Sequence, residues 1–140
     1  PPRSTLFPYT TLFRSIHDWD IRSAFDSNAG LDPACVPVLL DMSPRWLGMC
    51  FRPSATLAKP VVYGFKVGGE AYRMTVTGDA FQMEAGDASQ PDLSLSATGE
   101  QYLLFTYGRL TAADGIHLGR LSVDGDVSHL DQFEVWFKGL

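Results

Sequence analysis

The stretch that decides the fold is DLSLSATGEQYLLFTYGRLTAADGIHLGRLSVDGD, from Asp92 to Asp126. It opens with apolar residues that alternate with polar ones, which predicts a strand with one buried face. Thr98 and Gln101 then have the spacing of a capping box, in which each side chain accepts the other residue's free backbone N–H. We therefore expect a helix that continues through Tyr107 and ends at Gly108.

The second half of this stretch predicts a short helix followed by a strand. Thr111 and Asp114 can cap the short helix as Thr98 and Gln101 cap the first. A fifth strand is expected around Leu121 and Val123, and Asp126 can cap a last helix. That helix carries apolar residues at spacings of three and four, namely Val127, Leu130, Phe133 and Phe137.

Three further strands are expected before this stretch, at residues 61–67, 71–77 and 81–85, because apolar and polar residues alternate in each. Gly68–Gly69 and Gly78–Asp79 supply the turns between them. Together with the strand that begins at Asp92, they predict four antiparallel strands with one apolar face, which helices must cover. The predicted fold class is α+β, with a five-stranded, mainly antiparallel sheet and helices on one face.

The region before the sheet is less regular. Between Ala34 and Met49, apolar residues suggest helix, but Pro37 and Pro44 must lie in first turns or divide the segment. One or two short helices are expected there. Residues 16–33 end in a cluster of Asn, Gly, Asp and Pro, which predicts a short helix followed by a linker.

Charge and composition exclude several classes of function. The net charge is −5, and the eleven basic residues form no cluster, so this fragment is not expected to bind nucleic acid. Cys35 and Cys50 lack a C-x-x-C spacing and follow no secretory signal, so we expect buried, reduced thiols in a cytoplasmic protein. No apolar run is long enough for a membrane span.

Motifs for metal binding or catalysis are not found. His17, His117 and His129 are too far apart in sequence to place two imidazoles on one helical face, so no metal site is expected. The chain has no G-x-S-x-G elbow, no recognisable Cys-His signature and no glycine-rich phosphate loop. We expect neither catalysis nor a cofactor in this domain.

Aromatic and methionine side chains are the remaining candidates for a binding site. One interpretation is that they only fill a core, as apolar stripes usually do. The other is that they line a pocket for an apolar small molecule or lipid, because the last helix has a wide apolar arc and Met adapts to irregular cavities. The candidate residues are Tyr72, Met74, Phe81, Met83, Phe105, Tyr107, Phe133, Trp136 and Phe137.

Three motifs resemble the sterol carrier protein type-two family. They are D-L-S-L at residues 92–95, G-R-L at 108–110 and G-R-L-S-V-x-G-D at 119–126, and the likeness extends from about Tyr63 to Phe137. The resemblance implies a non-catalytic domain that holds an apolar ligand in a tunnel between the sheet and the helices. It also implies that Phe105, Phe133 and Phe137 line that tunnel.

Residues 31–126 are also similar to the C-terminal part of HxlR-type winged-helix transcriptional regulators. That resemblance implies a sensor module, with DNA bound only through a missing N-terminal domain. The alternative is an accessory C-terminal domain of a larger enzyme, because the fold resembles parts of maleylpyruvate isomerase-like proteins and alkyl sulfatases. The sequence upstream of Ile16 would distinguish the two hypotheses.

The first fifteen residues, PPRSTLFPYTTLFRS, resemble a translated sequencing adapter. We therefore expect residues 1–15 to be an artefactual segment, residues 16–33 to be the remnant of an upstream segment with a linker, and residues 34–140 to form the sterol carrier protein-like domain. If the fifth strand lies at a sheet edge, it can pair with its copy, so a homodimer is left open.

Overall fold

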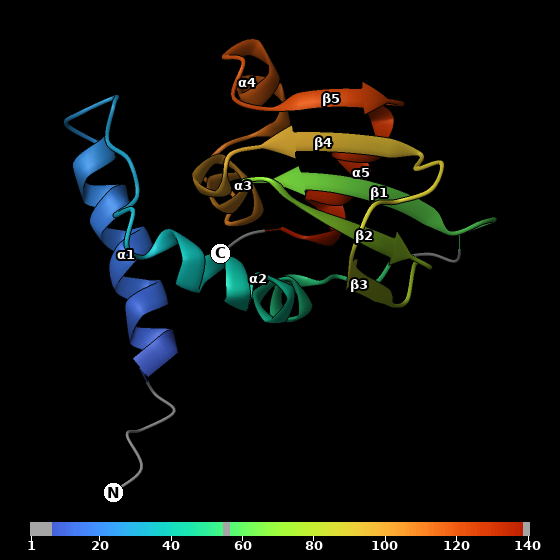
Figure 1. Ribbon diagram of the computed structural model, residues 1–140, viewed down its shortest axis with the longest axis horizontal. Coiled ribbons are helices and arrows are strands. Elements are labelled where there is room, and N and C mark those ends of the chain that lie inside the picture. The colour runs from blue at the N-terminus through green and yellow to red at the C-terminus, as the bar shows by residue number, and fades with distance from the viewer. Residues whose placement is uncertain (1–6, 55–56, 139–140) are drawn as a thin grey trace, which may run out of the picture. The chain divides into compact units, whose positions relative to one another are not determined.

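The computed structural model describes residues 7–54 and 57–138 (Figure 1). The chain divides into two compact units, one ending at Ser43 and the other beginning at Pro44. The second unit contains the sheet and the candidate functional site.

The first unit is built on a long helix, α1 (Phe7–Ser23). Two of its side chains hold the segment that follows: Trp19 Nε1 donates to the carbonyl of Ala29 at 2.8 Å, and Arg22 donates to the carbonyl of Gly30 at 2.7 Å. The helix predicted after Ile16 is thus part of a longer one, which begins within the first fifteen residues. The origin of those fifteen residues stays a prediction.

Helix α2 (Val36–Cys50) is a single element and contains Pro44 in its interior. The expectation that Pro44 begins or divides a helix was therefore wrong, whereas Pro37 does lie in the first turn. Pro44 has no N–H to donate to the preceding turn, so the helix loses one hydrogen bond there. The boundary between the two units falls at this same position.

The sheet has five strands in the order β3-β2-β1-β4-β5, and all five predicted strands are present (Figure 1). Three of the four pairings are antiparallel, so the predicted fold class is confirmed. The strands are β1 (Val61–Val67), β2 (Glu70–Val76), β3 (Phe81–Ala85), β4 (Leu93–Ala97) and β5 (Ser122–Gly125).

One detail of the predicted sheet was wrong, because β4 pairs with β1 in parallel instead of continuing an antiparallel series. The connection from β3 passes over the face of the sheet at Gly64, where an added Cβ would lie 3.3 Å from Ala88 Cβ and 3.4 Å from Pro91 Cγ. Alternation along a strand identifies its buried face but not its partner, so this crossover was not readable from the sequence.

Helices α3 and α4 of the second unit begin where the sequence predicts. Helix α3 (Gly99–Thr106) is capped by Thr98, whose hydroxyl accepts the Gln101 N–H, and α4 (Ala112–His117) is capped in the same way by Thr111. Helix α5 (Ser128–Trp136) begins one residue later than expected: Val127 is its N-cap residue and makes no side-chain cap hydrogen bond, while the Asp126 carboxylate accepts the Ser128 N–H at 2.9 Å. The Ser128 N–H is the largest influence that holds the pKa of Asp126 below its usual value.

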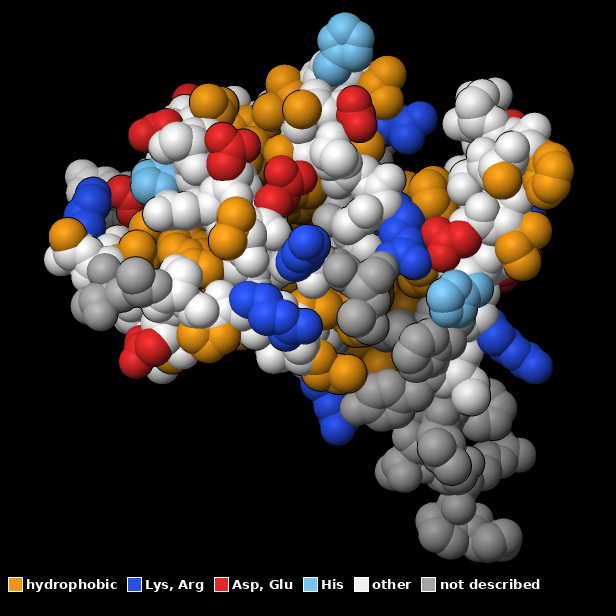
Figure 2. Space-filling view, turned by 180° about the vertical axis from the view of Figure 1, so that it is seen from behind, with side chains coloured by type: hydrophobic (Ala, Val, Ile, Leu, Met, Phe, Trp, Pro, Cys, Tyr) orange, Lys and Arg blue, Asp and Glu red, His pale blue; other side chains and the backbone are white. Residues whose placement is uncertain are grey.

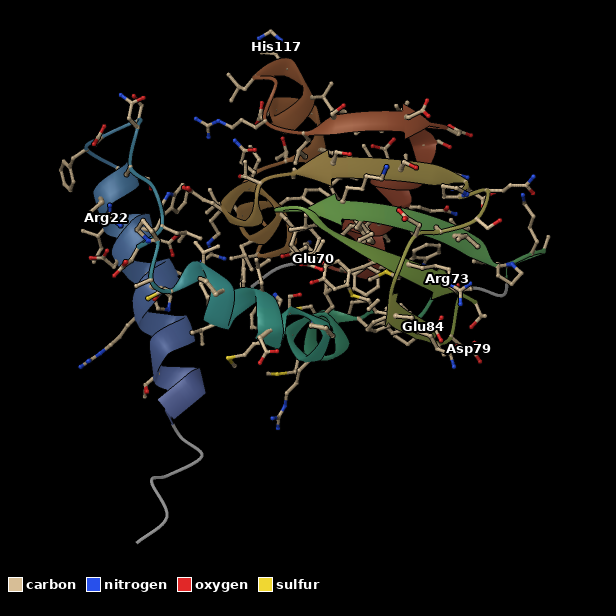
Figure 3. The ribbon with its side chains drawn as sticks, viewed as in Figure 1. Arg22, Glu70, Arg73, Asp79, Glu84 and His117 are labelled. Atoms are coloured by element: carbon tan, nitrogen blue, oxygen red, sulfur yellow. The ribbon has the colours of Figure 1, made fainter. Side chains whose placement is uncertain are left out.

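The two faces of the sheet differ in polarity. Tyr63 and Phe65 of β1 lie on the inner face, where both contact Phe133 of α5 edge to face at 5.5 and 5.8 Å. On the outer face, Arg73 and Glu84 form an ion pair between neighbouring strands (Figure 3). Helices thus cover only the inner face, as expected for a sheet with one apolar side.

Both ends of the sheet are open edges formed by short strands. β3 lies at one edge and β5 at the other, so β5 has the position that pairing between two copies would require. The homodimer itself remains a prediction.

Candidate functional site

An open groove with a volume of about 590 Å³ lies beside α5, and we call it the α5 groove. Three segments form it: the end of α3, the turn that leads to α4, and the exposed side of α5 with the residues after it. Its lining residues are Phe105, Gly108, Thr111, Asp131, Phe133, Glu134, Val135, Phe137 and Lys138.

The floor of the α5 groove is aromatic. The rings of Phe105 and Phe133 are stacked with centroids 5.2 Å apart, and those of Phe133 and Phe137 lie 4.7 Å apart. All three side chains are buried, so they offer the groove only the part of each ring that neighbouring atoms do not cover. The family resemblance places these three residues around a tunnel between the sheet and the helices, whereas the α5 groove is open and its described lining residues include none from the strands.

Two more phenylalanines extend this cluster below the groove. Phe81 contacts Phe137 edge to face at 5.0 Å, and Phe51 lies 5.1 Å from Phe81 and 5.3 Å from Phe137. Phe51 was not predicted, because it follows α2 in a passage without periodicity. A backbone bridge between Phe51 and Phe137 holds this passage against the end of α5.

Charged side chains form the walls of the α5 groove. Glu134 Oε1 accepts the N–H of Ala112 at 2.8 Å, which joins α5 to the first turn of α4. Asp131 and Lys138 are exposed, and Val135 presents an exposed apolar side chain. These residues were not among the predicted ones, although the spacing of Asp131, Glu134 and Val135 by three and four places them on one face of α5.

Four predicted ligand residues lie on the sheet and do not line the α5 groove. Met74 is fully buried between its register partners Tyr63 and Met83. Phe81 and Met83 are half-buried on β3. Tyr72 borders a separate, smaller hollow of about 120 Å³ beside Gly64.

The remaining two predicted residues have other contacts. Trp136 Nε1 donates to Ser54 Oγ at 2.6 Å, which secures the loop after α2 to α5. Tyr107 packs on Trp46 with ring centroids 4.5 Å apart, and burial raises the pKa of its hydroxyl far above the usual value. In the part of the chain that the structure describes, this buried hydroxyl has no hydrogen-bond partner.

Other kinds of site have little support. Over residues 7–54 and 57–138, no group of three or more His, Cys, Asp or Glu side chains could hold a metal ion. None of the described helices has the length and apolar character needed to cross a membrane. Both cysteines are free; burial raises the pKa of the Cys50 thiol, whereas Cys35 is only half-buried, contrary to expectation.

Comparison with known proteins gives a family match and several structural likenesses. Residues 56–138 match the SCP-2 sterol transfer family. A search of curated proteins found no match.

Among solved structures, sterol carrier protein 2 from Aedes aegypti in complex with palmitate is 17% identical, with a TM-score of 0.52 over 71% of this chain and 90% of that one. Sterol carrier protein-2 like-3 from the same organism is 12% identical, with a TM-score of 0.52 over 71% and 93%.

A mutant of the sec-alkyl sulfatase PisA1, an enzyme from Pseudomonas sp., is 15% identical, with a TM-score of 0.61 over 69% of this chain. The match covers only 16% of the sulfatase chain. At these identities, the likenesses show a shared fold.

Proposed function

Because the chain belongs to the SCP-2 sterol transfer family, we propose that its sheet unit binds an apolar small molecule or lipid in the α5 groove. The observation that carries this proposal is the aromatic floor of the groove, where Phe105, Phe133 and Phe137 meet beneath an open volume of about 590 Å³. A hollow of this volume lies within the size range of small-ligand sites.

The driving force for binding is the same as that for folding. An alkyl chain in the groove removes its own surface and the exposed parts of the rings from water, which contributes roughly 25 cal/mol per Å² of apolar surface. The palmitate complex of the similar Aedes aegypti protein supports an acyl chain as a ligand class. The proposal assigns no catalytic step to this unit.

Val135 offers a test that leaves the fold intact, because its side chain lines the groove and is 65% exposed. We expect dodecan-1-ol to raise the melting temperature of the wild-type chain, since a ligand that binds only the folded state stabilises it. Val135→Asp should weaken binding about tenfold, because a carboxylate in the groove must lose water when the alkyl chain enters.

Val127→Asp is the matched control, because Val127 is 59% exposed, lies beside the start of α5 and does not line the groove. Its affinity for dodecan-1-ol should equal that of the wild type. The proposal fails if dodecan-1-ol causes no shift in the wild type, or if both variants bind as the wild type does.

Two kinds of larger protein are proposed as the context of this unit. The resemblance to HxlR-type regulators supports a sensor module that responds to its ligand. The likeness to a small part of a sec-alkyl sulfatase supports an accessory domain of an enzyme instead. The reading frame upstream of Ile16 decides between them: a helix-turn-helix with basic residues supports the regulator, and a cluster of metal ligands supports the enzyme.

A further inference from the structure

We propose that the α5 groove selects amphiphiles with a cationic polar end, and that long-chain alkylammonium ions bind it more tightly than alkyl carboxylates do. This inference rests on the proposed function and goes further by naming the ligand class. It rests mainly on the charged walls of the groove.

Two carboxylates line the α5 groove on one face of α5. Asp131 and Glu134 are three residues apart, so their side chains emerge next to each other on the helix. Among the described residues, neither carboxylate lies within ion-pair distance of a basic side chain. An alkylammonium group at the mouth of the groove would thus meet two carboxylates that pair with no basic side chain of residues 7–54 and 57–138.

Glu134 is held in position by the fold. Its Oε1 accepts the Ala112 N–H at 2.8 Å, and it is half-buried between α5 and α4. A carboxylate fixed in this way loses less side-chain entropy when it binds a cation than a free surface carboxylate does. Glu134 is therefore the stronger of the two selecting residues, and Asp131 adds charge from the exposed side.

Among the described residues that line the groove, Lys138 is the only basic one, and it is exposed. A fatty-acid carboxylate could pair with it, but the same carboxylate would be repelled by Asp131 and Glu134. The whole chain adds to this repulsion, because its net charge is −5. Figure 2 shows acidic side chains beside hydrophobic ones on this side of the second unit, with basic side chains close by.

The aromatic floor also favours a cation. An ammonium group within about 6 Å of an aromatic face is attracted to the ring's electrons. Phe105, Phe133 and Phe137 line the same groove as the two carboxylates, although each ring is largely buried. A carboxylate head group gains nothing comparable there.

The test compares three ligands with the same alkyl chain, namely dodecylammonium, dodecan-1-ol and dodecanoate, by displacement of a neutral fluorescent apolar probe at neutral pH. We expect dodecylammonium to bind about fivefold more tightly than the alcohol, because exposed ion pairs contribute up to about 1 kcal/mol. Dodecanoate should bind more weakly than the alcohol.

The variant Asp131→Asn/Glu134→Gln should remove this order of affinities, because it removes both charges. The amide oxygen that it introduces at position 134 can still accept the Ala112 N–H, so the joint between α5 and α4 is kept. Asp131→Asn alone, at an exposed position, should reduce the preference by a smaller factor without altering the fold. The control Glu70→Gln/Asp124→Asn removes the same amount of charge from exposed residues that do not line the groove, and should keep the order.

Three results overturn the inference. If all three ligands bind equally, or dodecanoate binds most tightly, the selection is absent while the proposed function stands. If the control variant also removes the order, overall charge and not the groove sets the preference. If none of the three displaces the probe, the proposed function fails together with this inference.

Discussion

Asp92 connects three segments of the second unit. Its Oδ2 accepts the Val62 N–H at 2.9 Å, its Oδ1 lies 3.1 Å from Lys59 Nζ, and its backbone carbonyl accepts the Asp126 N–H at 3.4 Å. The Val62 N–H and then Lys59 hold the pKa of this carboxyl below its usual value. Lys59 is largely exposed, so the Val62 hydrogen bond contributes more to stability than the ion pair does.

We predict that Asp92→Asn lowers the free energy of unfolding by about 1 kcal/mol at neutral pH, because a charged acceptor binds the Val62 N–H more strongly than an amide does. A carboxyl whose pKa is lowered by folding stabilises the protein above its unfolded pKa, and this contribution is lost as the pH falls through the folded pKa. Urea denaturation should show the wild type and variant converging as the pH falls below the usual range of an aspartate carboxyl.

Asp124→Asn is the control for this prediction, because Asp124 is exposed on β5. It should change the free energy of unfolding by less than about 0.5 kcal/mol at neutral pH. A gap between the wild type and Asp92→Asn that stays constant from neutral to acidic pH would contradict the role given to Asp92.

Two buried tyrosines form a matched pair for a second prediction. The Tyr63 hydroxyl donates to the carbonyl of His129 at 2.8 Å, whereas the Tyr107 hydroxyl has no hydrogen-bond partner among the described residues. Tyr63→Phe should therefore destabilise the protein by about 1 kcal/mol, and Tyr107→Phe should leave its stability unchanged or raise it. Thermal unfolding of both variants measures this, and equal losses would refute it.

At the level of single residues, the sequence predicts the floor of the groove better than its walls. The rings of Phe105, Phe133 and Phe137 form one cluster, and both helical spacing and the family resemblance predict that these side chains point inward. Tyr107 and Trp136 follow the same pattern, yet they pack elsewhere, because the position of a side chain around a helix does not fix which neighbour it meets. Asp131 and Glu134 were missed because an exposed carboxylate usually has no role beyond solubility.

The end of β5 adopts a backbone conformation that favours glycine. Gly125 has a φ of 114°, and an added Cβ would lie 2.6 Å from the backbone oxygen of Asp92. This close approach fixes the register of β5 against β4, where Gly125 is opposite Leu93. Gly119 also has a positive φ, of 66°, but nothing lies within 4 Å of its added Cβ.

We predict that Gly119→Ala lowers the free energy of unfolding by about 1 kcal/mol, the cost of a left-handed conformation for alanine. Gly125→Ala should cost at least about 3 kcal/mol, because a clash with backbone atoms is added to the strain. Chemical denaturation of both variants provides the comparison. If both variants lost the same free energy of unfolding, β5 would be able to move away from Asp92 at no energetic cost.

At the level of elements, strands were more predictable than their partners. Alternation located β1 and β4 to within a residue, but their parallel pairing depends on the crossover that passes over Gly64. In α2, proline chemistry predicted an interruption at Pro44. Buried residues after Pro44, such as Trp46 and Leu47, stabilise the helix by tertiary packing. The local preference of proline does not take this packing into account.

For the whole molecule, the second unit holds the sheet, the aromatic cluster and the α5 groove. We predict that a chain of residues 34–140 folds without the first 33 residues and binds dodecan-1-ol as the full chain does, because the groove and its supporting contacts lie after Pro44. Calorimetry of both chains tests this. A cooperative transition only in the full chain would contradict the proposed boundary.

The most direct test of the central claim is an NMR titration of the full chain with dodecan-1-ol, which follows the backbone amide signals. If an apolar ligand occupies the α5 groove, saturable shifts should appear at Phe105, Thr111, Val135 and Phe137, while Thr75 and Ser94 on the outer face of the sheet stay unchanged. Shifts that do not saturate, or that are concentrated on the outer face, would contradict the account.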